Sequence, residues 1–367
     1  MSGRVLTVVG NRPQFIKAAP LSLALREAGI DEVVLHTGQH YDRQLSEVFF
    51  DELGLEPPAF RLEAGGGSHA EQLARMLPGI EQALVEVAPD WLLVYGDTNS
   101  TLAGGLVAAK LGCPIAHVEA GLRSFDRTMP EEVNRVLVDQ LSAALFCPSE
   151  QAVANLADEG VVAGVHLVGD VMLDANLRLA PLAQARSRAL ETAGVEPGGY
   201  TLLTIHREAN TRPEALAALV AALNELPGPI VFPVHPRTAG VLAAEGLVLG
   251  PNVVRVPPVG YLDFAALCSL ASLVLTDSGG VQKEAYWFGV PCITLRTTTE
   301  WPETVETGWN RLVGESLDAL PRLVEEAVPP VDRPPLYGDG RASGTIAAVL
   351  AAGAPAPDGA ARLAARA

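Results

Sequence analysis

The strongest constraint on the fold is a strand–helix–strand pattern between residues 91 and 119. An apolar run at residues 91–95 stops at Gly96-Asp97, a helix-forming stretch follows at about 100–111, and a second apolar run at 115–118 stops at Glu119. Two apolar strands joined by a helix are typical of a parallel sheet. Ligands bind beyond the carboxyl ends of such strands, so we expect Asp97 and Glu119 to point into one crevice.

A third acidic candidate follows the loop at residues 121–129. Pro130 predicts the start of a helix whose first turn holds Glu131 and Glu132;. These acids could serve only to complement the helix dipole, and Asp97 could be a helix cap. Glu119 has no such simple explanation, because an acid that ends an apolar strand is costly to bury. Asp97, Glu119 and Glu131 are therefore the first candidates for acid–base chemistry.

The same alternation of strands and helices runs through most of the 367 residues and predicts two similar α/β domains;. The first, residues 1–171, has strands expected at 4–9, 32–36, 91–95, 115–118, 144–147 and 166–168. The second, residues 172–342, has strands expected at 200–205, 230–234, 253–256, 273–276 and 292–295. A helix at about 343–352 is expected to rejoin the first domain, and the low-complexity tail at 353–367 is expected to be disordered.

Composition narrows the class of protein. The net charge of −17 argues against a nucleic-acid or anionic-membrane surface and favours a cytoplasmic protein;. We expect no signal peptide, and the sequence has no uninterrupted apolar run long enough to span a membrane;. The four cysteines are far apart and mostly lie in apolar runs, so they predict buried thiols rather than disulfides or a zinc site: Cys113, Cys147, Cys268 and Cys292;.

Two helix starts have the chemistry of an anion site. Arg12 and Lys17 flank the first turn of the helix that Pro13 opens, near the positive end of its dipole;. In the second domain, Ser278-Gly279-Gly280 opens a helix after a strand and lets backbone N–H groups approach a phosphate, while Glu284 can accept ribose hydroxyls. The two basic residues could instead be solvated surface, and an isolated Ser-Gly-Gly is a weak signal.

Two further strands of the second domain end in histidine motifs, His206-Arg207-Glu208 and His235-Pro236-Arg237. These histidines could face a ligand or be structural. With carboxylates in the first domain and phosphate-binding features in the second, the residues suggest a nucleotide-sugar bound in a cleft between two domains.

Taken in order, the motifs resemble those of the UDP-N-acetylglucosamine 2-epimerases. The resemblance covers residues from about 5 to about 348 and rests on GNRPQFIKAAPL, HTGQH, VYGDTNST, HVEAGLRS with MPEEVNR, TIHRE, PVHPR and LTDSGGVQKEA. It implies two Rossmann-like domains facing a cleft, as in GT-B glycosyltransferases. It also implies a UDP-sugar substrate, no metal or nicotinamide cofactor, and a homodimer.

The resemblance assigns residues to roles. Catalytic or substrate-contacting positions are matched by Arg12, Lys17, Asp97, Glu119, Glu131 and His206, and UDP-contacting positions by Phe264, Ser278, Gly280 and Glu284. Members of the family are understood to eliminate UDP between C1 and C2, forming a 2-acetamidoglucal, and to add UDP back with C2 inverted. This route needs a base, an acid and cations for the diphosphate. The acid–base work is assigned to Asp97, Glu119 and Glu131, and the departing UDP is expected to be stabilised by the Ser278 helix start with Arg12, Lys17, His206 and Arg207. Repulsion among the carboxylates is expected to raise the pKa of at least one.

Some positions depart from the pattern of the UDP-N-acetylglucosamine enzymes. Ala209 replaces the Glu of HRxEN, Trp301 replaces an Arg, and RPQFIKA replaces RPEAIKM. These variants resemble the branch that includes epimerases of UDP-2,3-diacetamido-2,3-dideoxyglucuronate, which leaves two candidate substrates. Gln39, His40 and Arg43 only partly match the allosteric site of the regulated bacterial enzymes, so allosteric activation is not predicted.

Three other interpretations remain open. A glycosyltransferase of this fold would share the Ser-Gly-Gly helix and Glu284 but would not need Asp97, Glu119 and Glu131 together;. A hydrolysing epimerase, which releases UDP and the free sugar, would use nearly the same residues. A non-catalytic nucleotide-sugar-binding protein could lose the acids, and this chain has kept all three.

Overall fold

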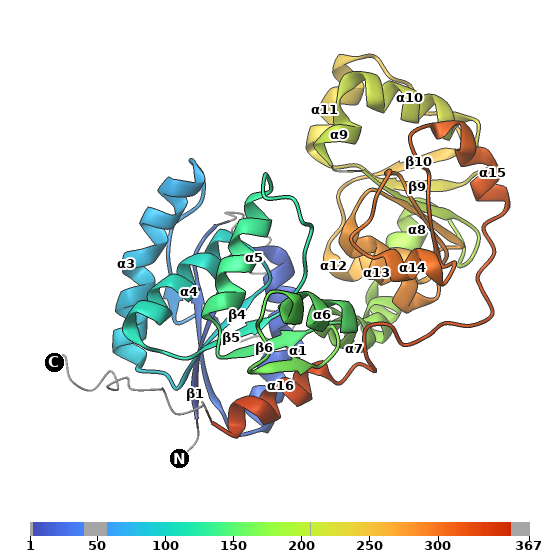
Figure 1. Ribbon diagram of the computed structural model, residues 1–367. Coiled ribbons are helices and arrows are strands. Elements are labelled where there is room, and N and C mark those ends of the chain that lie inside the picture. Colours follow the sequence, from blue (N-terminus) through green and yellow to red (C-terminus); the bar gives the residue numbers. More distant parts are fainter. Residues whose placement is uncertain (1–2, 40–56, 206, 354–367) are drawn as a thin grey trace. The chain divides into compact units, whose positions relative to one another are not determined.

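The computed structural model describes residues 3–39, 57–205 and 207–353, with only the backbone of Arg12 and Glu208. These residues form two compact units (Figure 1): unit 1 has the described residues up to 175 and from 337 onward, and unit 2 has those from 176 to 336. Each is a parallel sheet with helices on both faces, so the predicted α/β fold of two doubly wound Rossmann-like units is confirmed. The disordered tail predicted at 353–367 lies outside the described residues except for Gly353, so that prediction is untested. His40, Arg43 and His206 also lie outside the described residues.

The sheet of unit 1 has the order β3-β2-β1-β4-β5-β6-β7, with every neighbouring pair parallel. Its strands are β1 (Arg4–Val9), β2 (Asp31–His36), β3 (Phe60–Arg61), β4 (Trp91–Tyr95), β5 (Ile115–Val118), β6 (Ala144–Cys147) and β7 (Val165–Leu167). The sequence predicts about six strands, and the additional one is β3. This edge strand has only two residues, too few for a hydrophobic pattern to be visible;.

Helices cover both faces of this sheet: α1 (Arg12–Glu27), α3 (His69–Val87), α4 (Asn99–Leu111), α5 (Pro130–Leu141), α6 (Glu150–Asp158) and α16 (Ala342–Ala351). Figure 1 shows α3, α4 and α5 side by side, and they share a core with Leu92 and Val94 of β4. Leu93 and Tyr95 face the opposite core, which α1 and α16 cover. Successive β4 residues thus point to opposite faces, and both faces are apolar, as expected of a buried parallel strand.

The chain crosses from unit 1 to unit 2 within α7 (Val171–Arg186) and returns just before α16. Asp174 holds the segment where the chain re-enters unit 1. Its carboxylate accepts hydrogen bonds from the backbone N–H groups of Ala342 at 3.2 Å and of Ser343 at 2.7 Å. Both donors lie in the first turn of α16, so Asp174 caps that helix from a distant part of the chain.

Unit 2 has the sheet order β10-β9-β8-β11-β12-β13, again parallel throughout. Its strands are β8 (Thr201–Thr204), β9 (Ile230–Pro233), β10 (Val253–Val256), β11 (Leu273–Thr276), β12 (Cys292–Thr294) and β13 (Asn310–Leu312). Its helices are α8 (Ala189–Ala193), α9 (Glu208–Thr211), α10 (Pro213–Asn224), α11 (Pro236–Ala244), α12 (Tyr261–Ser269), α13 (Gly279–Phe288), α14 (Pro302–Glu306), η1 (Leu317–Ala319) and α15 (Leu320–Glu325). The sequence does not predict β13, because its Asn-Arg-Leu sequence has no apolar run.

All four cysteines are buried and free, as the sequence predicts. Over the described ranges, no helix combines the length and apolar character needed to cross a bilayer.

Candidate active site

Asp97 and Glu119 lie at the same edge of the unit 1 sheet. β4 and β5 run parallel with Tyr95 opposite Val118, so the two strands end level with each other. Gly96, between the end of β4 and Asp97, has φ +61°, and a β-carbon there would lie 3.1 Å from Glu119 Oε2. Glycine therefore suits both the backbone conformation and the close approach of the Glu119 carboxylate.

Lys17 is ion-paired to Glu119. It lies in α1, whose first turn is capped by the side chain of Asn11. The side chains of Lys17 and Glu119 are only 12% and 13% exposed. Burial alone would lower the pKa of Lys17. The negative charges of Glu119, Asp170 and Asp97 outweigh burial, so the pKa of Lys17 is raised;. Three carboxylates therefore act on one lysine at this edge.

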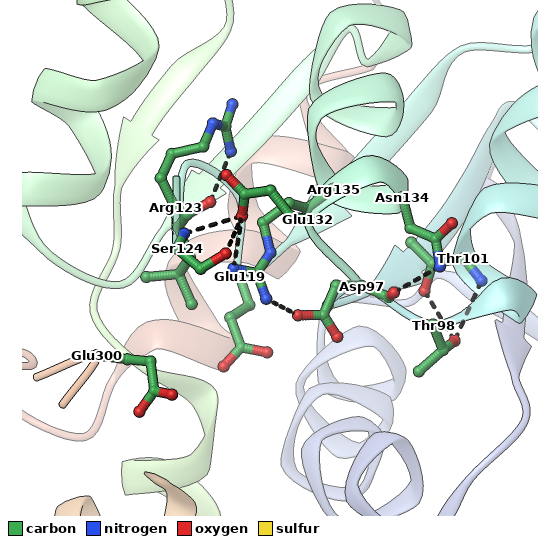
Figure 2. A network of polar contacts seen from close by, with 12 residues as sticks. Asp97, Thr98, Thr101, Glu119, Arg123, Ser124, Glu132, Asn134, Arg135 and Glu300 are labelled. Carbon is green, nitrogen blue, oxygen red and sulfur yellow. Dashed lines mark hydrogen bonds and ion pairs between the residues drawn. The ribbon is translucent and has the colours of Figure 1, made fainter. Parts of the chain in front are cut away.

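Asp97 is held by Arg135 of α5 (Figure 2). Arg135 donates hydrogen bonds to Asp97 Oδ2 and, at 3.2 Å, to Glu132 Oε2. The neighbouring Asn134 donates from Nδ2 to the carbonyl oxygen of Asp97 at 2.9 Å. Burial would lower the pKa of Arg135, but that pKa is raised by three carboxylates, Asp97, Glu132 and Glu119;. Arg135 is thus a fixed cation between Asp97 and the start of α5.

Glu132 organises the loop that follows Glu119. Its buried carboxylate accepts hydrogen bonds from Ser124 N and Oγ, each at 2.9 Å, and from Phe125 N at 3.0 Å. Figure 2 shows Glu132 between Ser124 and Arg135. Glu131, the residue that the sequence favours, is instead exposed in the first turn of α5. Its catalytic role stays a prediction.

The backbone at Glu119 is strained. Its φ of +69° lies in the left-handed region, as does the φ of +57° at Phe125. A residue with a β-carbon in this conformation costs about 1–2 kcal/mol, and such residues cluster at functional sites. At Glu119 the strain accompanies a buried ion pair with Lys17. This combination is the strongest structural indication of chemistry in unit 1.

Unit 2 places the Ser-Gly-Gly motif at the start of α13. Ser278 is the N-cap residue, but its side chain makes no capping hydrogen bond. A β-carbon on Gly280 would meet nothing closer than Ser278 Oγ at 3.9 Å, so the space at Gly280 is open to an approaching group, whereas a β-carbon on Gly279 would meet Glu300 Oε2 at 3.3 Å. Glu284 is buried one turn later, and Phe264 on α12 packs against the core that α13 shares. These are the features expected of a phosphate and ribose site.

Arg207 lies in a cluster of charged groups of unit 2. It donates to Glu300 Oε1 at 3.0 Å, and Arg296 donates to both Glu300 oxygens at 2.8 and 2.9 Å. Burial would raise the pKa of Glu300, but Arg296 and Arg207 lower it to about 2;. Arg207 and Arg296 also line a cavity of about 980 Å³ within this unit. The described parts of the chain include neither His206 nor the Arg12 side chain.

Several residues of these networks are not singled out by the sequence. They are His117, Asp139, Arg135, Asp170 and Glu300. Arg135 and Asp139 stand three and seven residues after Glu132, which places all three near one face of α5, and this spacing is a usable signal. No local pattern marks Asp170 or Glu300. The expected repulsion among carboxylates stays a prediction, and the structure gives Asp97 and Glu119 a cation each.

Comparison with known proteins identifies the family. The family model described as UDP-N-acetylglucosamine 2-epimerase matches residues 23–351. The chain belongs to this family. It is 47% identical over 359 residues to the UDP-2,3-diacetamido-2,3-dideoxy-D-glucuronate 2-epimerase of Pseudomonas aeruginosa, covering 95% of this chain and 99% of the relative. It is 44% identical over 330 residues to the UDP-N-acetylglucosamine 2-epimerase of Methanocaldococcus jannaschii, covering 87% of this chain and 90% of the relative.

The fold agrees with the family. A crystal structure of the M. jannaschii UDP-GlcNAc 2-epimerase in complex with UDP-GlcNAc and UDP matches 96% of this chain and 100% of that chain, with a TM-score of 0.84 and 40% identity. This member of the epimerase family therefore has the GT-B-like fold, and it is a nucleotide-sugar 2-epimerase, an isomerase.

Proposed function

We propose that this epimerase inverts C2 of a UDP-N-acetylhexosamine, converting UDP-GlcNAc to UDP-ManNAc without net hydrolysis. A base removes the proton from C2, the electrons of the C2–H bond form the C1–C2 double bond, and the C1–O electron pair leaves with UDP. UDP then returns to C1 of the 2-acetamidoglucal while an acid protonates the opposite face of C2. The observation that carries this proposal is a pair of carboxylates, Asp97 and Glu119, at one sheet edge, each beside its own cation.

In this proposal the cations position the acids as well as neutralise them. Lys17 and Arg135 have side chains only 12% and 13% exposed, so each is restricted to the neighbourhood of its carboxylate. Asp97 and Glu119 would then keep the fixed positions that proton transfer needs. Glu131 completes the proposed acid–base set of three carboxylates, with the acid and base roles still to be assigned by experiment.

The two units have different proposed tasks. Unit 1 supplies the acid–base groups, and unit 2 binds UDP at the open start of α13;. The charge of the departing diphosphate would be stabilised by the start of α13 at Ser278 and by four side chains, those of Arg12, Lys17, His206 and Arg207. Neither a metal nor a nicotinamide is needed for these steps. The residues proposed to bind UDP in unit 2 are Ser278, Gly279, Gly280, Glu284 and Phe264.

A second substrate, UDP-2,3-diacetamido-2,3-dideoxyglucuronate, has specific support. The P. aeruginosa relative with 47% identity is named for that sugar. Trp301 and Ala209 also depart from the sequence pattern of the UDP-GlcNAc enzymes. In this chain Trp301 takes part in a cation–π contact instead, with Lys283 Nζ 3.9 Å from the centroid of its ring;.

Proton NMR of the purified protein with UDP-GlcNAc in D₂O tests the reaction. We expect a UDP-ManNAc anomeric signal and deuterium at C2 of both sugars, because the abstracted proton exchanges with solvent. Release of UDP with free ManNAc would instead identify the hydrolysing reaction, and transfer of the sugar to an added acceptor would identify a glycosyltransferase. If UDP-GlcNAc does not react, the same experiment with the diacetamido-glucuronate decides between the two substrates.

The oligomeric state is independent of the reaction. We propose a homodimer on the basis of the family resemblance, and sedimentation equilibrium of the purified protein checks it. A monomer at the concentrations used for the NMR experiment would contradict the homodimer without affecting the proposed reaction.

A further inference from the structure

His117 contacts the backbone of the candidate site next to Asp97 without being one of its acids. It is fully buried on β5, two residues before Glu119. Its Nδ1 is 2.7 Å from Asp139 Oδ1, and its Nε2 is 2.7 Å from the carbonyl oxygen of Gly96. Gly96 immediately precedes Asp97, so one imidazole connects the backbone beside Asp97 to α5.

The hydrogen-bond partners determine where the protons of His117 must be. The carbonyl oxygen of Gly96 can only accept a hydrogen bond, so Nε2 must carry a proton. The ion pair of the other Asp139 oxygen with Arg123 Nη1 at 2.7 Å, joined by Gly121 N at 3.1 Å, favours an ionised carboxylate, which can only accept;. Both ring nitrogens therefore face acceptors, which requires a proton on each.

The charges around Asp139 support its ionised form. Burial would raise the pKa of Asp139, but hydrogen bonding and the charges of His117 and Arg123 lower it;. Arg123 is shared with Glu159, which it contacts at 2.7 Å through two nitrogens. Arg123 alone leaves this cluster of Asp139 and Glu159 one negative charge in excess, and an imidazolium at His117 would neutralise it;.

We propose that His117 is a doubly protonated positioning residue, an imidazolium that fixes the backbone before Asp97 to α5 and to the loop after Glu119. The connection to the loop runs through Asp139, whose carboxylate accepts hydrogen bonds from Gly121 N and Arg123 Nη1. Cys147 on β6 adds no charge, because burial and Asp139 raise the pKa of its thiol to about 12. The charged groups of the cluster that holds this imidazolium are Asp139 of α5, Arg123 of the loop and Glu159 at the end of α6.

The protonation state can be measured on the wild-type protein. Selective ¹⁵N labelling of histidine gives the shifts of both ring nitrogens, and the His117→Gln variant assigns them by the signals that disappear. We expect both nitrogens of His117 to carry a proton under the conditions of the activity measurements, because both face hydrogen-bond acceptors;. An unprotonated ring nitrogen under these conditions would overturn the proposal.

The positioning role rests on the proposed function and has its own readout. In His117→Gln, one of the two hydrogen bonds is lost, so we expect kcat to fall about 10- to 100-fold with KM changed less than about threefold. His166→Gln, on β7 of the same sheet, is the matched control and should keep wild-type kcat. Wild-type kcat in His117→Gln would overturn the positioning role.

A second variant tests the proposed charge balance between His117 and Asp139. Asp139→Asn preserves the size of the side chain but removes its charge, so we expect His117 to become neutral, with a proton kept on Nε2 for Gly96. The ¹⁵N shift of Nδ1 should then move to that of an unprotonated nitrogen, and two protonated nitrogens in this variant would contradict the proposed charge balance. If wild-type protein proves inactive on both candidate sugars, the proposed function fails while these NMR measurements still decide the protonation state.

Discussion

Each unit places one aspartate just beyond a central strand of its sheet, and these two aspartates have different environments. Asp97 follows β4 in unit 1, and its side chain is 30% exposed beside Arg135. Asp277 follows β11 in unit 2 and is fully buried, with Oδ2 accepting hydrogen bonds from Arg207 N and Asn210 Nδ2 at 3.1 Å each. The shared fold supplies the position, whereas exposure and partners decide whether an acid can meet a substrate or only support a loop.

Removing the charge of each aspartate gives the largest expected effects. Asp97→Asn is expected to lower kcat about 10²- to 10⁴-fold with little change in stability, because general acid–base catalysis contributes that much. Asp277→Asn is expected to lower the free energy of unfolding by about 1–3 kcal/mol, because its amide cannot accept both hydrogen bonds as well as the carboxylate does. Epimerisation rates and urea unfolding of both variants provide the measurement.

An independent control uses Asp158, an exposed aspartate at the end of α6. Asp158→Asn should change neither kcat nor stability. If Asp97→Asn and Asp277→Asn lose activity and stability to the same extents, the two acids have equivalent tasks and the contrast between the units is wrong.

Much of the layout of these two sheet edges follows from sequence. The apolar runs predict the central strands, and Gly96-Asp97 and Ser278-Gly279-Gly280 follow them as expected;. The partners are not predictable in the same way. Arg135 reaches Asp97 from 38 residues away, and Glu300 reaches Arg207 from 93 residues away, so only tertiary packing reveals these contacts. Residue types at strand ends are a local property, whereas the charge balance of a site depends on the whole unit.

The glycines at the two edges offer a second contrast. Gly96→Ala would place a β-carbon 3.1 Å from Glu119 Oε2 in a residue with φ +61°, so we expect a loss of about 1 kcal/mol in stability and a lower kcat;. Gly280→Ala meets only Ser278 Oγ at 3.9 Å, so we expect unchanged stability and a KM for the UDP-sugar raised about 10-fold, since the methyl group obstructs a phosphate;.

Thermal unfolding and steady-state kinetics separate the two glycine variants. Gly240→Ala in α11, where a β-carbon meets nothing within 4 Å, controls for the general effect of adding a methyl group to a helix. An unchanged KM in Gly280→Ala would remove the start of α13 from the UDP site.

Glu300 gives unit 2 a pH dependence that can be assigned to one residue. Although burial opposes the change, Arg296 and Arg207 depress its pKa from 4.5 to about 2, so its ion pairs stabilise the folded state above pH 4.5 and lose their contribution as the pH falls towards 2;. Its side chain is 30% exposed, and after allowance for solvent screening the effect is about 1 kcal/mol;. The difference in unfolding free energy between wild type and Glu300→Gln should therefore shrink between about pH 5 and about pH 3.

The control for this measurement is Glu303→Gln, which removes a carboxylate from the first turn of α14 in the same unit. Its difference from wild type should not follow the titration of Glu300. A constant difference between wild type and Glu300→Gln across this pH range would mean that Arg207 and Arg296 do not depress the pKa of Glu300.

The smallest expected effect concerns the strained loop of unit 1, which has no counterpart in the described part of unit 2. Phe125 has φ +57° and is 78% exposed, so Phe125→Gly relieves the backbone at little loss of packing and should stabilise the protein by about 0.5–1 kcal/mol;. Ala88, the C-cap of α3 with φ +45°, is the matched control, and Ala88→Gly should stabilise by a similar amount with unchanged kcat and KM;. If Phe125→Gly gains stability but loses activity, the strain at Phe125 is retained for the site. If both variants keep full activity, the functional strain of unit 1 is confined to Glu119.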